Sequence, residues 1–485
     1  MNTKLLKQKI LDLAIRGKLT QQLKSDGTAA DLLKEICDRT QEKTSLRAKR
    51  GNPSPQTIIP LDKSEAPFEI PANWEWVRLG DVAKKITDGT HHSPVNLETG
   101  DFMYVTAKNI KDDGIHLENI TYVSSDTHKE IFARCNPEKG DVLLIKDGAT
   151  TGVVTVNNLE EPFSLLSSVA LLKLGSSIES WYLAFVIRST LFNQMIRSQM
   201  KGVGITRVTL KQIESFAFPL PPLAEQQRIV EKIQEAFAEI DSIENNKELL
   251  KTHIKQTRQK ILDLAIHGKL VPQNKSDEPA SVLLERITRD NPHYEKLTDI
   301  PFEIPDSWEW VKLGDVCKPI KRGKSPKYIE HSNVLVFAQK CNQKDGPVSL
   351  EKALYLDEST LNKYPKEEFL QKGDVVINST GTGTLGRVGY FNVDLPQNIK
   401  GIVPDSHVTT IRSFYVNPYY LYCFLKNKQT YLEENGEGST NQKELKPHTI
   451  YDLEFPLPPL AEQKRIVDRI EEIFKSLDEI SLHLV

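Results

Sequence analysis

The nine-residue stretch FPLPPLAEQ occurs at 218–226 and again, letter for letter, at 455–463. In both places the prolines precede a sequence with helical periodicity, where the fixed φ and missing N–H of proline cost little. An internal repeat of this kind constrains architecture more strongly than any single motif. The chain is therefore predicted to contain two similar units.

Other segments repeat in the same order. QKILDLAIRGKL at 8–19 returns at 259–270 with 11 of 12 residues identical, and PFEIPANWEWVRLGDV at 67–82 returns at 301–316 with 13 of 16. KGDVLLIKDGATTG at 139–152 has a looser counterpart in KGDVVINSTGTGTLG at 372–386. The four offsets, 251, 234, 233 and 237, differ, so the segments between these anchors changed length independently. We interpret the anchors as scaffold and the intervening sequence as the variable part.

A coiled-coil stripe follows each proline corner. Positions with 4,3 spacing run over 36 residues from Ile229 to Leu264, which is about 54 Å of helix at ~1.5 Å per residue. A shorter copy runs from Ile466 to Leu484. We predict two long antiparallel helical regions, one central and one composed of the two chain ends, that separate the units around a pseudo-twofold axis. The seam residues are Ile229, Ile233, Ile240, Ile243, Leu250, Ile254, Ile466, Ile470, Ile473, Leu477 and Ile480.

Each unit reads as a mixed α/β (α+β) domain. Short β-like runs such as DFMYVTA and NVLVFAQ are followed by the amphipathic helical stretches 181–200 and 418–434. The predicted division of the chain is a helical segment at 1–45, a linker at 46–66, a first globular domain at 67–222, a central helical region at 223–300, a second globular domain at 301–459 and a terminal helix at 460–485.

Composition excludes several classes of protein. No apolar run approaches the ~20 residues that a bilayer span needs, and Lys4, Lys7 and Lys9 interrupt the apolar pattern of the N-terminus. We therefore expect a cytoplasmic protein that has no membrane association. The five cysteines are odd in number, widely spread and without a CxxC pair, which argues against a disulfide framework and a zinc site.

Charge is unevenly distributed within an overall net charge of −3. Residues 162–213 hold six Lys or Arg against one acidic residue, and residues 317–344 hold seven against one. Such basic islands are consistent with binding to a polyanion, although windows of this size also reach such a balance by chance.

Three motifs have a structural and a functional interpretation. The indoles of Trp74 and Trp76 share one face if the segment is extended, and we favour core packing over a base-stacking platform. His91 and His92 point to opposite faces on a strand, which argues against a ligand pair, and a surface loop is favoured over a base-reading role. The G-x-G-x-x-G at 381–386 precedes another strand-like stretch, whereas a dinucleotide site needs a helix there.

With these repeated motifs in hand, the chain resembles the specificity subunit of a Type I restriction-modification system over essentially all 485 residues. The resemblance implies a non-catalytic subunit in which each of two target recognition domains reads half of a split duplex DNA target. It further implies that the repeated helices, including the seam residues above, dock two methyltransferase subunits, to which restriction subunits add. S-adenosylmethionine, ATP and Mg²⁺ are then expected on those partner subunits, with no cofactor on this chain.

Motif position selects candidate DNA-binding residues, because polar side chains in a groove specify bases while Lys and Arg on phosphates set affinity. In the first unit these are Thr90, His91, His92, Ser93, Lys108, Asn109, Lys146, Thr150, Thr151, Lys201, Thr206 and Arg207. In the second unit they are Lys321, Arg322, Lys324, Gln339, Lys340, Ser379, Thr380, Thr382, Thr384, Ser439, Thr440, Asn441 and Lys443. Two alternatives stay open at this point: a multisubunit scaffold without a DNA role, and a dinucleotide-dependent enzyme.

Overall fold

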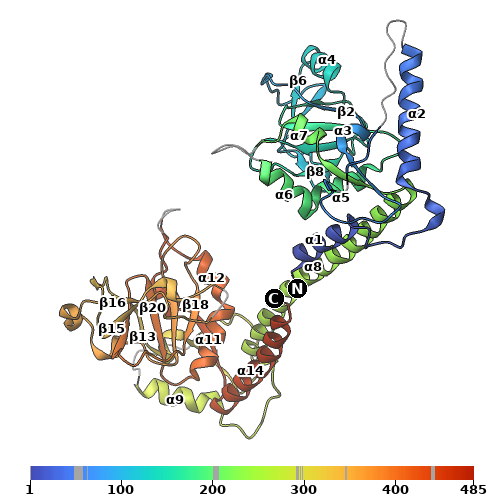
Figure 1. Cartoon of the computed structure of the whole chain (residues 1–485). Coiled ribbons are helices and arrows are strands. Elements are labelled where there is room, and N and C mark those ends of the chain that lie inside the picture. Colours follow the sequence, from blue (N-terminus) through green and yellow to red (C-terminus); the bar gives the residue numbers. More distant parts are fainter. Residues whose placement is uncertain are drawn as a thin grey trace. The chain divides into compact units, whose positions relative to one another are not determined.

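The computed structural model describes residues 2–47, 58–62, 64–199, 207–290, 294, 297, 299–344, 347–438 and 443–484. The chain divides into two compact units, Met1–Asn246 and Lys247–Val485. Figure 1 labels the elements of both units. Each unit mixes helices with short β-strands, as the sequence predicts.

In the first unit the central sheet has the strand order β2-β10-β7-β8, with every pair antiparallel. A second sheet, β6-β3-β9, contains one parallel pair, and β1-β11 and β4-β5 form two-stranded ladders. The strands are β1 Glu75–Arg78, β2 Ala83–Asp88, β3 Phe102–Val105, β4 Ile110–Lys111, β5 Gly114–Ile115, β6 Thr121–Val123, β7 Val142–Ile145, β8 Val154–Val156, β9 Ser164–Leu165, β10 Val169–Leu174 and β11 Ala217–Leu220. The helices are α1 Thr3–Ala14, α2 Ala29–Arg47, α3 Leu79–Val82, α4 Ser125–Arg134, α5 Ser180–Arg188, α6 Thr190–Gln199, α7 Leu210–Glu214 and the start of α8 Leu223–Ile266.

The second unit repeats the central sheet in the same order, as β13-β20-β17-β18. Its second sheet is β14-β16-β15-β19, with β15 parallel to β19, and its two-stranded ladder is β12-β21. The strands are β12 Glu309–Lys312, β13 Cys317–Arg322, β14 Tyr328–Ile329, β15 Val334–Phe337, β16 Leu354–Leu356, β17 Asp374–Asn378, β18 Val388–Phe391, β19 Gly401–Pro404, β20 Val408–Ser413 and β21 Glu454–Leu457. The helices are the end of α8, then α9 Ala280–Asp290, α10 Leu313–Val316, α11 Pro418–Asn427, α12 Gln429–Glu434, α13 Pro447–Tyr451 and α14 Leu460–Leu482.

Each of the two predicted amphipathic stretches forms two helices instead of one. In the first unit the chain is extended at Ser189, between α5 and α6. The carboxylate of Asp12 accepts hydrogen bonds from the backbone N–H of Thr190 at 2.9 Å and from its hydroxyl at 2.8 Å. A carboxylate from a distant segment thus satisfies the start of α6, which local periodicity cannot reveal.

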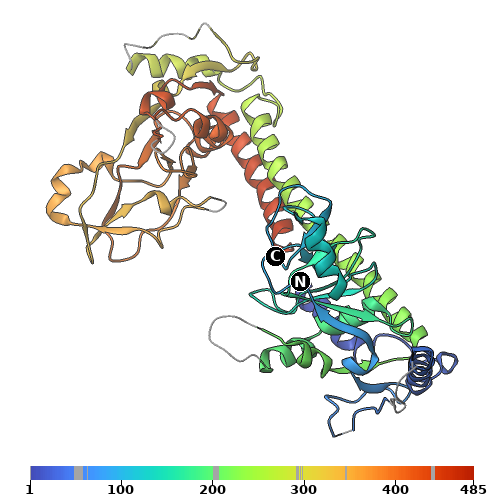
Figure 2. The same cartoon turned by 90° about the horizontal axis from the view of Figure 1, so that it is seen from above.

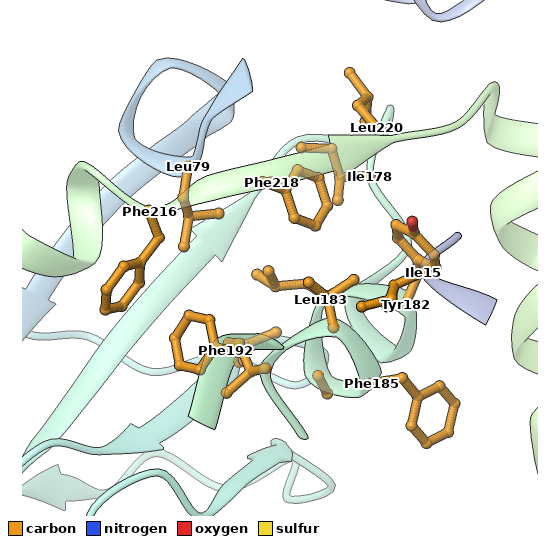
Figure 3. Close-up of a cluster of buried hydrophobic side chains, with 14 of the residues drawn as sticks. Ile15, Leu79, Ile178, Tyr182, Leu183, Phe185, Phe192, Phe216, Phe218 and Leu220 are labelled. Atoms are coloured by element: carbon orange, nitrogen blue, oxygen red, sulfur yellow. The ribbon is translucent and has the colours of Figure 1, made fainter. Parts of the chain in front are cut away.

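The proline corner belongs to the core of its unit. In the first unit β11 carries Phe218 and pairs with β1, and Tyr182 on α5 donates a hydrogen bond to the Pro219 carbonyl at 2.9 Å. Figure 3 shows Tyr182, Leu183 and Phe218 within the same cluster of buried side chains. In the second unit Tyr420 donates to the Pro456 carbonyl at 3.1 Å. The two corners therefore have equivalent packing.

The Glu-Gln pair that ends the repeated motif is also buried. Gln226 accepts a hydrogen bond from the Glu179 backbone N–H at 2.8 Å and donates to the Pro221 carbonyl at 3.0 Å. Gln463 makes the same two contacts, with Asn417 N–H at 2.8 Å and the Pro458 carbonyl at 2.9 Å. These contacts give a reason within the chain for the exact recurrence of the motif.

The KGD anchor holds an ion pair beneath the central sheet. Asp141, which directly precedes β7, forms an ion pair with Lys173 on β10 at 2.8 Å. At the equivalent place Asp374 accepts two hydrogen bonds from Arg412 on β20, at 2.7 and 2.8 Å. The aspartate of this anchor is therefore a structural group that ties two strands of the sheet together.

Helix packing within each unit agrees in part with the predicted seam. In the first unit α1 lies antiparallel to α8, since Lys7 pairs with Asp241 while Gln22 reaches back to Glu225. In the second unit α14 lies antiparallel to α8, since Arg258 pairs with Asp478 at 2.5 Å and covers the Phe474 ring. Figure 2 shows α14 in red along the yellow-green part of α8.

Part of the seam is not available for docking partner subunits. Ile229 and Ile233 belong to the core of the first unit, and Ile466 and Ile470 to the core of the second. Ile473 and Leu477 pack against that second core, and Ile240 and Ile254 are buried as well. The residues nearest each proline corner thus stabilise their own unit, contrary to a docking role, because the helix starts inside the core. Ile243, Leu250 and Ile480 are exposed.

Candidate nucleic-acid interface

The predicted loops of the first unit meet at one edge of the central sheet. Strands β2 and β7 both end at this edge, and β10, antiparallel to both, begins there. Thr90 follows β2 and donates its N–H to the Leu165 carbonyl at 2.8 Å. Residues 146–151 follow β7, and Arg207 joins them through a β-bridge to Asp147. Segments more than 100 residues apart in sequence thereby form one surface.

Two carboxylates organise the charges at this edge. Asp88 is buried and is surrounded by Arg134 Nη2 at 2.5 Å, His91 Nε2 at 3.2 Å and Lys146 Nζ at 3.4 Å. Asp147 accepts a hydrogen bond from Lys146 at 2.9 Å. Sequence reasoning selected the loop that contains Asp147 but not Asp88 or Arg134, because only the folded sheet brings these two side chains to that loop.

Arg207 covers the second oxygen of Asp147. Its Nε lies 3.0 Å from Asp147 Oδ1, and the Arg207 side chain is 59% exposed. Within the part of the chain that the structure describes, this Oδ1 atom is buried and accepts no hydrogen bond. The pair thus combines a solvent-facing cation with an acceptor whose hydrogen-bonding capacity is unused.

The second unit builds the same edge from different side chains. Arg322 ends β13, Thr380 follows β17, and His407 precedes β20. Arg322 donates hydrogen bonds to the Glu444 carboxylate and to the Ser406 carbonyl. Thr380 forms a β-bridge with Glu444, and its hydroxyl lies 2.7 Å from His407 Nδ1. His407 and Glu444 were also missed by sequence reasoning.

Two further clusters flank Arg322. The Thr384 hydroxyl donates to Gln339 Oε1 at 2.8 Å. Lys321 and Lys324 both pair with Glu368, the latter at 2.7 Å. Burial alone would raise the pKa of Glu368, but the hydrogen bonds from the two lysines outweigh burial and hold that pKa below its usual value. Several cations at this edge are therefore paired with carboxylates of the same unit.

Three predicted residues are part of the framework and not of the surface. Lys146 is 3% exposed and is held by Asp88 and Asp147. Asn109 is buried and accepts a hydrogen bond from the Thr106 N–H at 3.0 Å. Ser379 is buried with its hydroxyl 2.5 Å from that of Thr409. These side chains are satisfied within the protein, which corrects the prediction that they contact a ligand.

The other described candidates have exposed or half-buried side chains. They are Thr90, His91, His92, Ser93, Lys108, Thr150, Thr151 and Arg207 in the first unit, and Lys321, Arg322, Lys324, Gln339, Lys340, Thr380, Thr382, Thr384 and Lys443 in the second. Five candidates, Lys201, Thr206, Ser439, Thr440 and Asn441, lie outside the described residues.

The glycine-rich loop at 381–386 joins two antiparallel strands, β17 and β18. A dinucleotide site instead places the N-terminus of a helix after the loop, where it can bind the pyrophosphate. A Cβ at Gly386, whose φ is +75°, would lie 2.5 Å from the Glu433 backbone nitrogen. The glycine allows this hairpin to approach α12, so the geometry disfavours the dinucleotide alternative.

Among the residues described, no group of three or more His, Cys, Asp or Glu lies where it could hold a metal ion. Over the same part of the chain, no helix is both long and apolar enough to cross a bilayer.

Comparison with known proteins identifies the family. The model of the Type I restriction modification DNA specificity domain matches residues 71–252 and 305–483, one match in each unit. The chain belongs to this family. The matched ranges include both candidate edges and both proline corners.

Several relatives cover nearly the whole chain. The chain is 25% identical to the Type I restriction enzyme EcoEI specificity subunit of Escherichia coli, over 99% of this chain and 90% of that protein. It is 27% identical to the MjaVIII specificity subunit of Methanocaldococcus jannaschii, over 84% of this chain and 87% of that protein. The crystal structure of an HsdS subunit from Thermoanaerobacter tengcongensis has a TM-score of 0.54 at 20% identity, covering 87% of this chain and 94% of the other. The structural likeness shows a shared fold.

Proposed function

We propose that this chain is the DNA sequence-recognition subunit of a Type I restriction-modification complex and reads a two-part duplex target. One observation carries the proposal: the same edge of the same sheet, in two units, presents different side chains. Strand β2 of the first unit ends with Asp88, whereas the equivalent strand β13 ends with Arg322. The residue that forms a β-bridge with the loop after the third strand of the sheet order is Arg207 in the first unit and Glu444 in the second. Two readers on one scaffold are what a target with two unlike halves requires.

The chemistry of these edges suits DNA. Cations and amide, hydroxyl and imidazole groups alternate there, and such groups bond to phosphates and to base edges in the major groove. The basic island at 317–344 supplies Lys321, Arg322 and Lys324 to the second edge, and the island at 162–213 supplies Arg207 to the first. Lys321 and Lys324 share the single carboxylate of Glu368, so this cluster keeps a net positive charge that favours a DNA phosphate.

The helices supply spacing and docking in this proposal. We propose that α8, together with α1 and α14, forms the antiparallel helical regions that hold the two readers apart and dock two methyltransferase subunits, to which restriction subunits add. The exposed apolar side chains of Ile243, Leu250 and Ile480 are candidates for that contact. S-adenosylmethionine, ATP and Mg²⁺ would be bound by the partner subunits, and this chain would itself be non-catalytic.

Single-molecule methylation sequencing of the source genome, with and without this gene, tests the proposal. Loss of a split motif methylated in both halves on deletion is the expected result. An unchanged methylome in a strain that expresses the partner subunits would instead favour a scaffold without a DNA role. Replacing residues 83–215 by another variable segment also distinguishes DNA recognition from a scaffold role. One half of the methylated motif should change only if these residues recognise DNA sequence.

A further inference from the structure

Each edge carries an ion pair that uses the position shared by Arg207 and Glu444, with a cation there in the first unit and a carboxylate in the second. Ala170 of β10 pairs with Asp88 and Leu144, while Thr409 of β20 pairs with Arg322 and Ile377, so Asp88 and Arg322 are topological equivalents. The bridges Asp147–Arg207 and Thr380–Glu444 are likewise equivalent. The cation of the first pair, Arg207, therefore lies on the segment that forms the β-bridge. The cation of the second pair, Arg322, lies at the end of β13.

Resting on the function proposed above, we propose that the Asp147–Arg207 pair and the Arg322–Glu444 pair each read one G·C base pair in their half-site. A surface that bound only phosphates would be weakened by carboxylates, yet each edge keeps one beside its arginine. In the major groove guanine offers the O6 and N7 acceptors that arginine binds, and cytosine offers the N4 amino donor that a carboxylate accepts. A neighbouring arginine and carboxylate match both bases of that pair.

The geometry leaves these groups available. Asp147 Oδ1 is buried, lies 3.0 Å from Nε of the exposed Arg207 side chain and accepts no hydrogen bond from the described residues. Glu444 is 36% exposed and its described side-chain partner is Arg322. Movement of either arginine onto guanine would free the adjacent carboxylate for cytosine, so one ion pair supplies both contacts.

The test uses the full chain in complex with its methyltransferase subunits. Glu444→Gln keeps the shape of the side chain and removes the charge, and Asp147→Asn does the same in the other unit. Asp394→Asn is the matched control, because it uncouples an exposed ion pair with Lys372 in the second unit, outside the proposed docking helices. The readout is the methylated motif together with binding to a library of randomised half-sites.

We expect Glu444→Gln to relax one G·C position of one half-site by about tenfold or more, and Asp147→Asn to relax a position in the other half-site. Asp394→Asn should change neither. If the base preference stays the same at every position in both variants, the carboxylates only neutralise arginine and the inference is overturned. Tighter overall DNA binding would not alter this conclusion. If one variant does not assemble, the other still decides. A wild-type complex without any split motif would overturn the proposed function itself, and this inference with it.

Discussion

The indole N–H of Trp74 donates a hydrogen bond of 2.8 Å to the buried carboxylate of Glu225, 151 positions away. Trp308 and Glu462 repeat the contact at 3.0 Å in the second unit. In each unit a tryptophan of the NWEW or SWEW anchor is thereby fastened to the glutamate of FPLPPLAEQ. The tryptophan anchor and FPLPPLAEQ, two of the strongest repeats in the sequence, therefore contact each other in each unit.

Trp308→Phe should destabilise the second unit by about 1–3 kcal/mol, because it leaves a buried acceptor without its donor. Trp310→Phe is the matched control, since the Trp310 indole nitrogen is buried without a hydrogen-bond partner among the described residues. Thermal unfolding of both variants gives the comparison. Equal losses would mean that ring size, not the hydrogen bond, determines stability here.

Glu462→Gln should change the pH dependence of stability. Burial raises the pKa of Glu462 above its ordinary value of 4.5, and the hydrogen bonds from Trp308 and Gln273 offset this only in part. A carboxyl with a raised pKa contributes fully below its unfolded-state pKa, and that contribution is lost as pH rises through the folded-state pKa. The variant should therefore gain stability over the wild type at neutral pH, and the gain should vanish in acid. Urea unfolding at several pH values measures it, and a gain independent of pH would contradict the assignment.

Gly17→Ala should be markedly destabilising. Gly17 has φ +65°, and a Cβ there would lie 2.3 Å from Pro71 Cγ, so the added methyl group forces a shift in addition to backbone strain. Together these effects should cost about 2–5 kcal/mol. Gly140→Ala is the control, because Gly140 has φ +89° with open space around it, and should lose only ~1–2 kcal/mol. Melting temperatures of the two variants would rank them.

Arg207→Ala should weaken DNA binding by the assembled complex by about 1–3 kcal/mol and relax the preference at one G·C position, which is the effect of losing a base contact. Arg322→Ala should also weaken binding, while Arg469→Ala, on α14, should not. Fluorescence anisotropy over a salt series provides the measurement. Unchanged affinity at low salt for both Arg207→Ala and Arg322→Ala would argue against these edges as the DNA-binding face.

Lys146→Met should lower the free energy of unfolding and leave DNA affinity nearly unchanged. Lys146 is buried between Asp88 and Asp147, and its loss removes charged hydrogen bonds of about 1.5–3 kcal/mol in total. Lys108→Met, at an exposed position, should stay within ~0.5 kcal/mol of the wild type. Chemical denaturation compares the two. If the Lys146→Met protein is as stable as the wild type but binds DNA more weakly, Lys146 contributes to the DNA-binding interface.

Much of the fold was predictable from repetition and periodicity. The β-like runs at 101–107 and 333–339 contain β3 and β15, and the prolines of FPLPPLAEQ directly precede a helix in both copies. Seam residues were harder, because a 4,3 stripe has the same appearance whether a helix meets another helix or enters a core. Ile229 and Ile466 enter cores, and their sequence neighbourhood gives no sign of it.

The sequence by itself determined that the chain has two equivalent units, a mixed α/β class and a set of loops in which polar residues gather, because repeats, alternation and turn residues are local signals. Only the tertiary structure decided which of those polar residues face outward. Lys146 and Arg207 look alike in sequence, yet Lys146 is enclosed by Asp88 and Asp147 whereas Arg207 is exposed. The pairing of β2, β7 and β10 sets that difference, since it brings carboxylates from distant segments to one lysine and leaves the arginine at the rim of the sheet.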